Sequence, residues 1–130
     1  MAESHLSKTE TPPPHALLVQ MATAHWISHI VYVAAKLGLA DHLVRPKRAD
    51  ELAGPTNTDG PSLYRLMRTL AHLGLMTEDG AQHFSLTPLG DALKTGAPGA
   101  ARAAILTLAS PMMLRGWEHL LHSVQTGKSG

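Results

Sequence analysis

The stretch from Ala16 to Ala35 constrains the fold most, because it contains no formally charged residue, no glycine and no proline. Such a stretch predicts one long helix. Its apolar residues occupy nearly every face, and a helix that is apolar all round has to be buried all round. A chain of 130 residues cannot easily wrap one long helix completely. We therefore expect a second chain or a second domain to cover part of it.

The same stretch is long enough to cross a lipid bilayer. Polar side chains lie through its centre, however, where lipid makes them costly, and no cluster of basic residues flanks it closely. The start of the chain lacks a basic region followed by an apolar one, so we expect no secretory signal, no membrane partner and a cytoplasmic location. The polar residues of the stretch are Gln20, Thr23, His25, Ser28 and His29.

Prolines and glycines divide the chain into elements. Residues 1–13 are polar and end in a proline run, which predicts a disordered tail. The first helix is expected from Pro14 to Lys36, with Gly38 as its C-cap. A short helix over residues 50–53 is expected to stop at the Gly54-Pro55 pair.

Residues 62–73 carry leucine and methionine at helical spacing, and strands are expected over 75–77 and 82–86 around an Asp79-Gly80 turn. A short helix, a turn, a second helix and a hairpin form a winged helix-turn-helix. The expected fold is therefore mainly α, with a winged helix-turn-helix, a small β-hairpin and additional long helices. The later helices are expected over residues 88–94, 100–109 and 112–125.

The composition excludes several kinds of chemistry. The chain has no cysteine, which removes disulfides, thiolate metal sites and thiol nucleophiles. Its formal net charge of +1 gives no electrostatic footprint for nucleic acid. It also lacks a glycine-rich phosphate loop and a nucleophile elbow, and its carboxylates form no pair that we can place in one site. We therefore expect this chain by itself to be non-catalytic.

A histidine pair is the strongest candidate for a metal site. His25 and His29 lie four residues apart, so they share one face of the first helix, and His119 or His122 could supply a third ligand. The glutamate of a zinc protease motif is missing. A contact to a small molecule or to a partner chain fits the pair better, and we expect no metal.

The winged helix raises the alternative of a DNA-binding transcriptional regulator. Arg65 and Arg68 lie on its second helix, where a groove-reading helix carries its contacts. The wing tip, Glu78-Asp79, is acidic and would face phosphates unfavourably. We therefore expect no nucleic-acid partner.

Three strings of residues carry a family resemblance. They are YVAAKLGLADHL, then ADELAGPTNTDGPSLYRLMRTLAHLGLMTEDGAQHFSLTPLGDAL, then APGAARAAILTLASPMMLRGWEHLLHSVQTGKSG. Over about residues 15–130, their order resembles the N-terminal region of S-adenosylmethionine-dependent small-molecule O-methyltransferases. The resemblance implies a winged-helix-like dimerisation domain over residues 14–126. It also implies an intertwined homodimer formed through the first helix.

The resemblance further implies that this domain supplies part of the substrate pocket wall. Residues before and within the W-E-H-L helix would face the acceptor, and the first helix of the partner would reach the same pocket. Adjacent methionine and tryptophan would make an adaptable wall for a flat ligand. The expected substrate-binding residues are Met21, His25, Trp26, His29, Thr107, Ser110, Met113 and Trp117.

Members of this family continue into a Rossmann-like catalytic domain, which the present sequence does not contain. S-adenosylmethionine and methyl transfer to a hydroxyl of a small aromatic acceptor are therefore expected of the parent protein. We assign no catalytic or cofactor-binding residue to this chain. Residues 127–130 are interpreted as the start of a linker to the missing domain.

Overall fold

The computed structural model describes residues 11–129, so the expected tail lies mostly outside the described residues. Helix α2 (Pro14–Leu37) starts directly after the proline run. It ends at Gly38, whose φ of 67° lets its N–H donate to the carbonyls of Ala34 and Ala35. The first helix and its glycine C-cap are therefore confirmed.

A winged helix-turn-helix forms the body of the molecule. Its strands pair antiparallel, with Thr77 opposite Ser85, and Lys47 forms an isolated bridge with Phe84. The mainly α fold with a small hairpin is thus confirmed. In chain order the body contains α3 (Leu39–His42), α4 (Ala49–Thr56), α5 (Gly60–His72), β1 (Met76–Glu78), β2 (Phe84–Leu86) and α6 (Pro88–Asp91).

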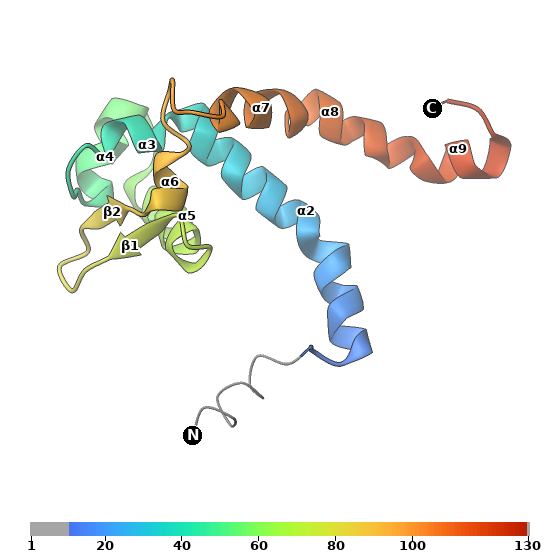
Figure 1. Ribbon diagram of the computed structural model, residues 1–130, viewed down its shortest axis with the longest axis horizontal. Coiled ribbons are helices and arrows are strands. Elements are labelled where there is room, and N and C mark those ends of the chain that lie inside the picture. Colours follow the sequence, from blue (N-terminus) through green and yellow to red (C-terminus); the bar gives the residue numbers. More distant parts are fainter. Residues whose placement is uncertain (1–10, 130) are drawn as a thin grey trace.

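Two helical arms leave this body and diverge (Figure 1). The α2 arm is α2 itself, and the α7–α9 arm comprises residues 101–129. The arms meet only near the body, where α7 packs against α2 and Arg102 Nε donates to the carbonyl of Ala35 at 3.0 Å. The second arm contains α7 (Ala101–Leu108), α8 (Pro111–Gly116), the 3-10 turn η1 (Trp117–His119) and α9 (Leu120–Thr126).

The hydrophobic core lies in the body. Phe84 is fully buried, and the edge of the Tyr64 ring packs against it with 5.8 Å between ring centroids. Within α2 only Ala34 and Ala35 are buried, and no described residue of the α7–α9 arm is. The body therefore has a core of its own, whereas the arms do not. The other fully buried large side chains are Leu39, Leu52, Met67 and Leu70.

Three expected helix boundaries are wrong, the first because α6 ends at Asp91 and not at Lys94. Helix α4 continues through Gly54 and Pro55 to Thr56. Pro55 lies in the last turn of the helix and has no N–H to donate to the carbonyl of Glu51, but Glu51 is exposed, so its carbonyl can bind water instead. The helix ends at Asn57, which has a φ of 54°. The helix expected over 112–125 is interrupted by η1, so it consists of two short helices joined by a tighter turn.

Strand β2 is shorter than expected and β1 is shifted by one residue toward the turn, because the Asp79 side chain organises a longer turn. Its carboxylate accepts hydrogen bonds from the backbone N–H groups of Ala81 and His83, both at 2.9 Å. These bonds fix the turn between Glu78 and Phe84, so pairing begins at those two residues.

Gly90 tests how closely α6 packs against the body. A Cβ at this position would overlap the backbone carbonyl oxygen of Leu75, which cannot rotate away. Gly90→Ala should lower the free energy of unfolding by about 2–4 kcal/mol. Gly116→Ala is the control: Gly116 has helical backbone angles and open space at the end of α8, so the free energy of unfolding should stay the same or rise by about 0.5–1 kcal/mol. Denaturant unfolding measures both, and a Gly90→Ala variant as stable as the parent would contradict this packing.

Asp41 holds the segment that leads to the α7–α9 arm. Its carboxylate accepts hydrogen bonds from the Thr95 hydroxyl at 2.6 Å and from the Thr95 N–H at 2.9 Å. These bonds hold the pKa of Asp41 below its ordinary value, and the bond from the hydroxyl has the larger effect. The folded state therefore favours the ionised form, and its contribution to stability is lost as the pH falls through the lowered pKa.

Asp41→Asn should lower the melting temperature at neutral pH, because the amide binds Thr95 more weakly than the carboxylate does. The difference from the parent should shrink as the pH falls below about 4, where the unfolded carboxyl becomes protonated. Thermal unfolding followed across this pH range measures it. Asp91→Asn, which removes only a surface ion pair with Lys94 at 3.2 Å, is the control and should change little. A difference that stays constant down to the lowest pH would count against the Asp41 clamp.

Candidate functional site between the two arms

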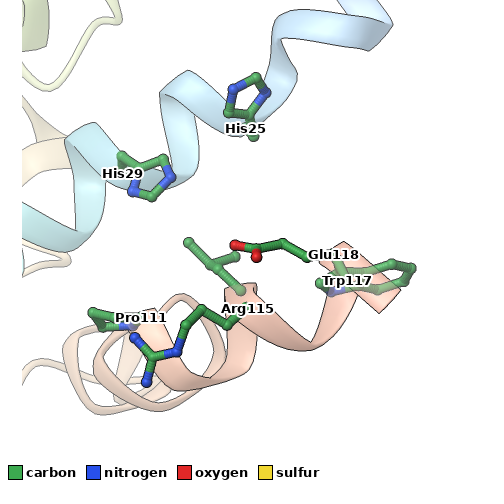
Figure 2. Close-up of a pocket in the computed structure, with 7 residues that line it drawn as sticks. His25, His29, Pro111, Arg115, Trp117 and Glu118 are labelled. Carbon is green, nitrogen blue, oxygen red and sulfur yellow. The ribbon is translucent and has the colours of Figure 1, made fainter. Parts of the chain in front are cut away.

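A groove of about 410 Å³ lies between α2 and the α8–η1 segment. Figure 2 shows His25 and His29 on α2, across this space from Arg115, Trp117 and Glu118. The groove exists because α2 and α8 belong to different arms, and these arms contact each other only near the body, where α7 packs against α2. Pro111 and Leu114 complete its lining.

The polar groups of the groove have few partners in their own chain. His25 Nδ1 lies 3.1 Å from the carbonyl oxygen of Ala22, one turn earlier, which leaves Nε2 available to a ligand. The His25 and His29 rings meet edge to face with 6.2 Å between centroids. Within residues 11–129, neither Arg115 nor Glu118 forms an ion pair. A cation, an anion and two imidazoles thus line an otherwise apolar groove.

A second hollow, of about 500 Å³, lies along the same arm and is lined mainly by other residues. Met112, Met113 and Leu120 give it an apolar wall, and His119 lies at its edge. Trp117 lines this hollow as well as the groove. Its side chain is 71% exposed, so the indole is available on either side of the arm.

The structure brings four of the eight expected site residues into these hollows. His25, His29 and Trp117 line the groove, and Met113 joins Trp117 in the second hollow. The other four line neither. Ser110 caps α8, because its hydroxyl accepts the N–H of Met113 at 3.3 Å. Met21, Trp26 and Thr107 are exposed on the arms.

Sequence reasoning missed Arg115 and Glu118. Both follow Pro111 at helical spacing, four and seven residues on, and so share a face with it. That spacing could have placed them together. It could not show that this face turns toward α2.

Both arms expose large apolar side chains. Among residues 11–129, fifteen large hydrophobic residues are exposed, and thirteen of them lie on the arms. Apolar surface gathered in this way marks an interaction site. Helix α2 also has the length and composition of a membrane-crossing helix. The thirteen are Leu18, Val19, Met21, Trp26, Ile27 and Val33 on α2, and Leu108, Met112, Met113, Trp117, Leu120, Leu121 and Val124 on the other arm.

Two arginines of the winged helix are held by partners within the body. Arg68 Nε lies 3.6 Å from a Glu78 carboxylate oxygen, and its guanidinium lies over the Tyr64 ring at 5.8 Å. Arg48 Nη1 donates to the carbonyl of Ala81 at 2.8 Å. Both arginines are therefore held within the body, and acidic Glu78 lies beside one of them, which disfavours phosphates.

Comparison with known proteins identifies the family. Residues 19–96 match the family model described as the O-methyltransferase dimerisation domain. The chain belongs to the O-methyltransferase dimerisation domain family. This match covers most of α2 together with the body, so the resemblance stated from the sequence is confirmed.

Relatives of this dimerisation domain are methyltransferases. The chain is 39% identical over 118 residues to phenazine O-methyltransferase PhzM of Lysobacter antibioticus, covering 90% of the chain and 34% of that relative. It resembles the crystal structure of N,N-8-amino-8-demethyl-D-riboflavin dimethyltransferase from Streptomyces davawensis, with a TM-score of 0.81 and 31% identity over 90% of the chain and 35% of that structure.

A third relative is an O-methyltransferase from neocarzinostatin biosynthesis, crystallised with S-adenosylmethionine and 2-hydroxy-5-methyl naphthoic acid. The TM-score is 0.67, with 34% identity over 78% of the chain and 32% of that structure. The chain therefore spans about a third of the length of these relatives.

Proposed function

We propose that this chain is the dimerisation and pocket-wall part of an S-adenosylmethionine-dependent methyltransferase. The parent protein would transfer a methyl group to a hydroxyl of a small aromatic acceptor in the cytoplasm. The observation that carries the proposal is a dimerisation domain in whose described residues most of the exposed large apolar side chains lie on the two arms. Surfaces of this kind require a cover, and the winged-helix body does not provide one.

A second copy of the chain covers the arms in this proposal. Helix α2 has 24 residues and is therefore about 36 Å long. It contacts the rest of its own chain mainly through its C-terminal part, near Ala34 and Ala35. Two copies related by a two-fold axis would place the same apolar arms against each other. The α2 helix of each copy would then enter the space between the arms of the other.

The acceptor lies against the α7–α9 arm in this proposal. Trp117 and Met113 supply a flat, polarisable wall, which suits an aromatic ring. The names of the relatives contain phenazine, riboflavin and naphthoic acid, all of them flat aromatic systems. The contribution of this domain is shape and exclusion of water. Thr107 and Ser110 of one chain and Met21, His25, Trp26 and His29 of the partner complete the proposed wall.

S-adenosylmethionine does not fit the residues of this chain. The two hollows of the described arms are open and largely apolar, with Glu118 as their single carboxylate. Neither contains a glycine-rich turn of the kind that approaches a nucleotide closely. We therefore place the cofactor in the part of the parent protein that this sequence does not include.

The oligomeric state tests the proposed assembly. Light scattering across dilution should give a mass near twice 13.9 kDa. Ile27 is 48% exposed on α2, so the variant Ile27→Asp would place a carboxylate in the apolar interface. The dissociation constant of the dimer should then rise by about 100-fold or more. Val44→Asp is the control, because Val44 is 76% exposed on the body, and it should leave the mass unchanged. A stable parent monomer, or equal effects of the two variants, would refute the assembly.

Acceptor binding tests the pocket wall in the full-length parent protein. Trp117→Ala and Met113→Ala should each weaken acceptor binding by about tenfold, because truncation removes apolar contact area. Binding of S-adenosylmethionine should change less than twofold by calorimetry, and Val44→Ala should affect neither ligand. Equal losses of acceptor and cofactor affinity would contradict the assigned role.

A further inference from the structure

Charged residues are divided unevenly between the body and the arms. Residues 11–129 contain eight carboxylate side chains, of which seven lie on the body and only Glu118 lies on the arms. The histidines show the opposite distribution, since five of the eight in the same range lie on the arms. These five are His15, His25, His29, His119 and His122.

The arm histidines lie among exposed apolar side chains. The His25 ring meets Trp26 at 6.0 Å and His29 at 6.2 Å between centroids. His119 lines the same hollow as Met113 and Leu120. Any partner that covers the apolar residues of the arms therefore covers imidazoles with them.

We propose that assembly through the arms is acid-sensitive, because the arm histidines have to be neutral when a second copy covers them. This inference rests on the proposed function, and it concerns the regulation of the same surface. A histidine side chain in water changes charge near pH 6.5. A neutral imidazole is tolerated in an apolar interface, whereas an imidazolium without a carboxylate partner is costly there.

The groups around His25 and His29 do little to offset added positive charge. Arg115 lines the same groove and is a further cation there, although its guanidinium extends along α8 toward Pro111, and Glu118 directs its carboxylate into the space between the helices (Figure 2). One carboxylate can neutralise one imidazolium. The arms of a second copy carry the same histidines, and their other charged residues are four cations and one carboxylate. The charged or titratable groups on other elements packed against α2 are Asp41 and His42 on α3, Arg65, Arg68 and His72 on α5, and Arg102 on α7.

The size of the effect follows from proton linkage. Each histidine that has to lose its proton on assembly multiplies the dissociation constant by about tenfold between pH 8 and pH 5.5. His25 and His29 of two copies together would give about 10⁴-fold. If Glu118 of each copy offsets one imidazolium, about 10²-fold remains. We therefore expect an increase of about 10²- to 10⁴-fold.

The dissociation constant of the dimer tests the inference. It is measured by light scattering and sedimentation across dilution, at about pH 8 and at about pH 5.5. Ionic strength is held constant, and far-UV circular dichroism checks that helicity is retained. The paired variant His25→Gln/His29→Gln stays neutral at either pH, so its pH ratio should fall by about tenfold or more. The body pair His72→Gln/His83→Gln is the matched control and should keep the parent ratio. Glu118→Gln removes the single carboxylate and should increase the ratio.

The outcomes separate the two proposals. A dimer whose dissociation constant is the same at both pH values would overturn the acid sensitivity and leave the proposed assembly standing. A monomer at pH 8 would overturn the assembly and the acid sensitivity with it. A loss of mass that comes with loss of helicity, or a body pair that flattens the pH response as much as the arm pair, would also overturn the inference.

Discussion

The structure depends on the joint at which the two arms leave the body. Ala34 and Ala35 are the buried end of α2, and the guanidinium of Arg102 donates to the Ala35 carbonyl there. Asp41 binds the backbone and the hydroxyl of Thr95 on the segment that leads into the second arm. Both polar contacts fix one arm relative to the other while leaving most of their length free. The space between the arms follows directly from this arrangement.

The joint also explains why the chain combines a stable core with an uncovered apolar surface. The body buries Phe84, Leu52 and Met67 in a core to which the arms contribute only at their roots, through Ala34, Ile30, Leu37 and Ile105. The arms leave Trp26, Trp117 and other large side chains in contact with water, each at a free-energy cost that a partner would remove. Folding and assembly are therefore assigned to different parts of one short chain.

Elements with strong local signals could be predicted from the sequence, and those that depend on tertiary packing could not. The proline run and Gly38 bracket the first helix, and Asp79 with Gly80 marks the hairpin, so both elements were expected correctly. The 3-10 turn at Trp117–His119 is preceded by Gly116, but a single glycine within a helical pattern does not by itself predict a break. Arg115 and Glu118 were missed for a related reason: the side of the α8–η1 segment on which they lie is visible in the sequence, but its rotation toward α2 is set by packing at the joint.

Trp117 connects the two roles of the second arm, because it lines the groove that faces α2 and also the hollow that contains Met113. A second copy seated in the groove would fix the indole from one side. The same ring would then form a rigid wall for an aromatic acceptor on the other side, since a side chain held by packing loses less entropy when a ligand binds. Assembly and acceptor binding would in this way be coupled through one residue. Covering the arm histidines would accordingly make the pocket wall respond to the same protons that control assembly.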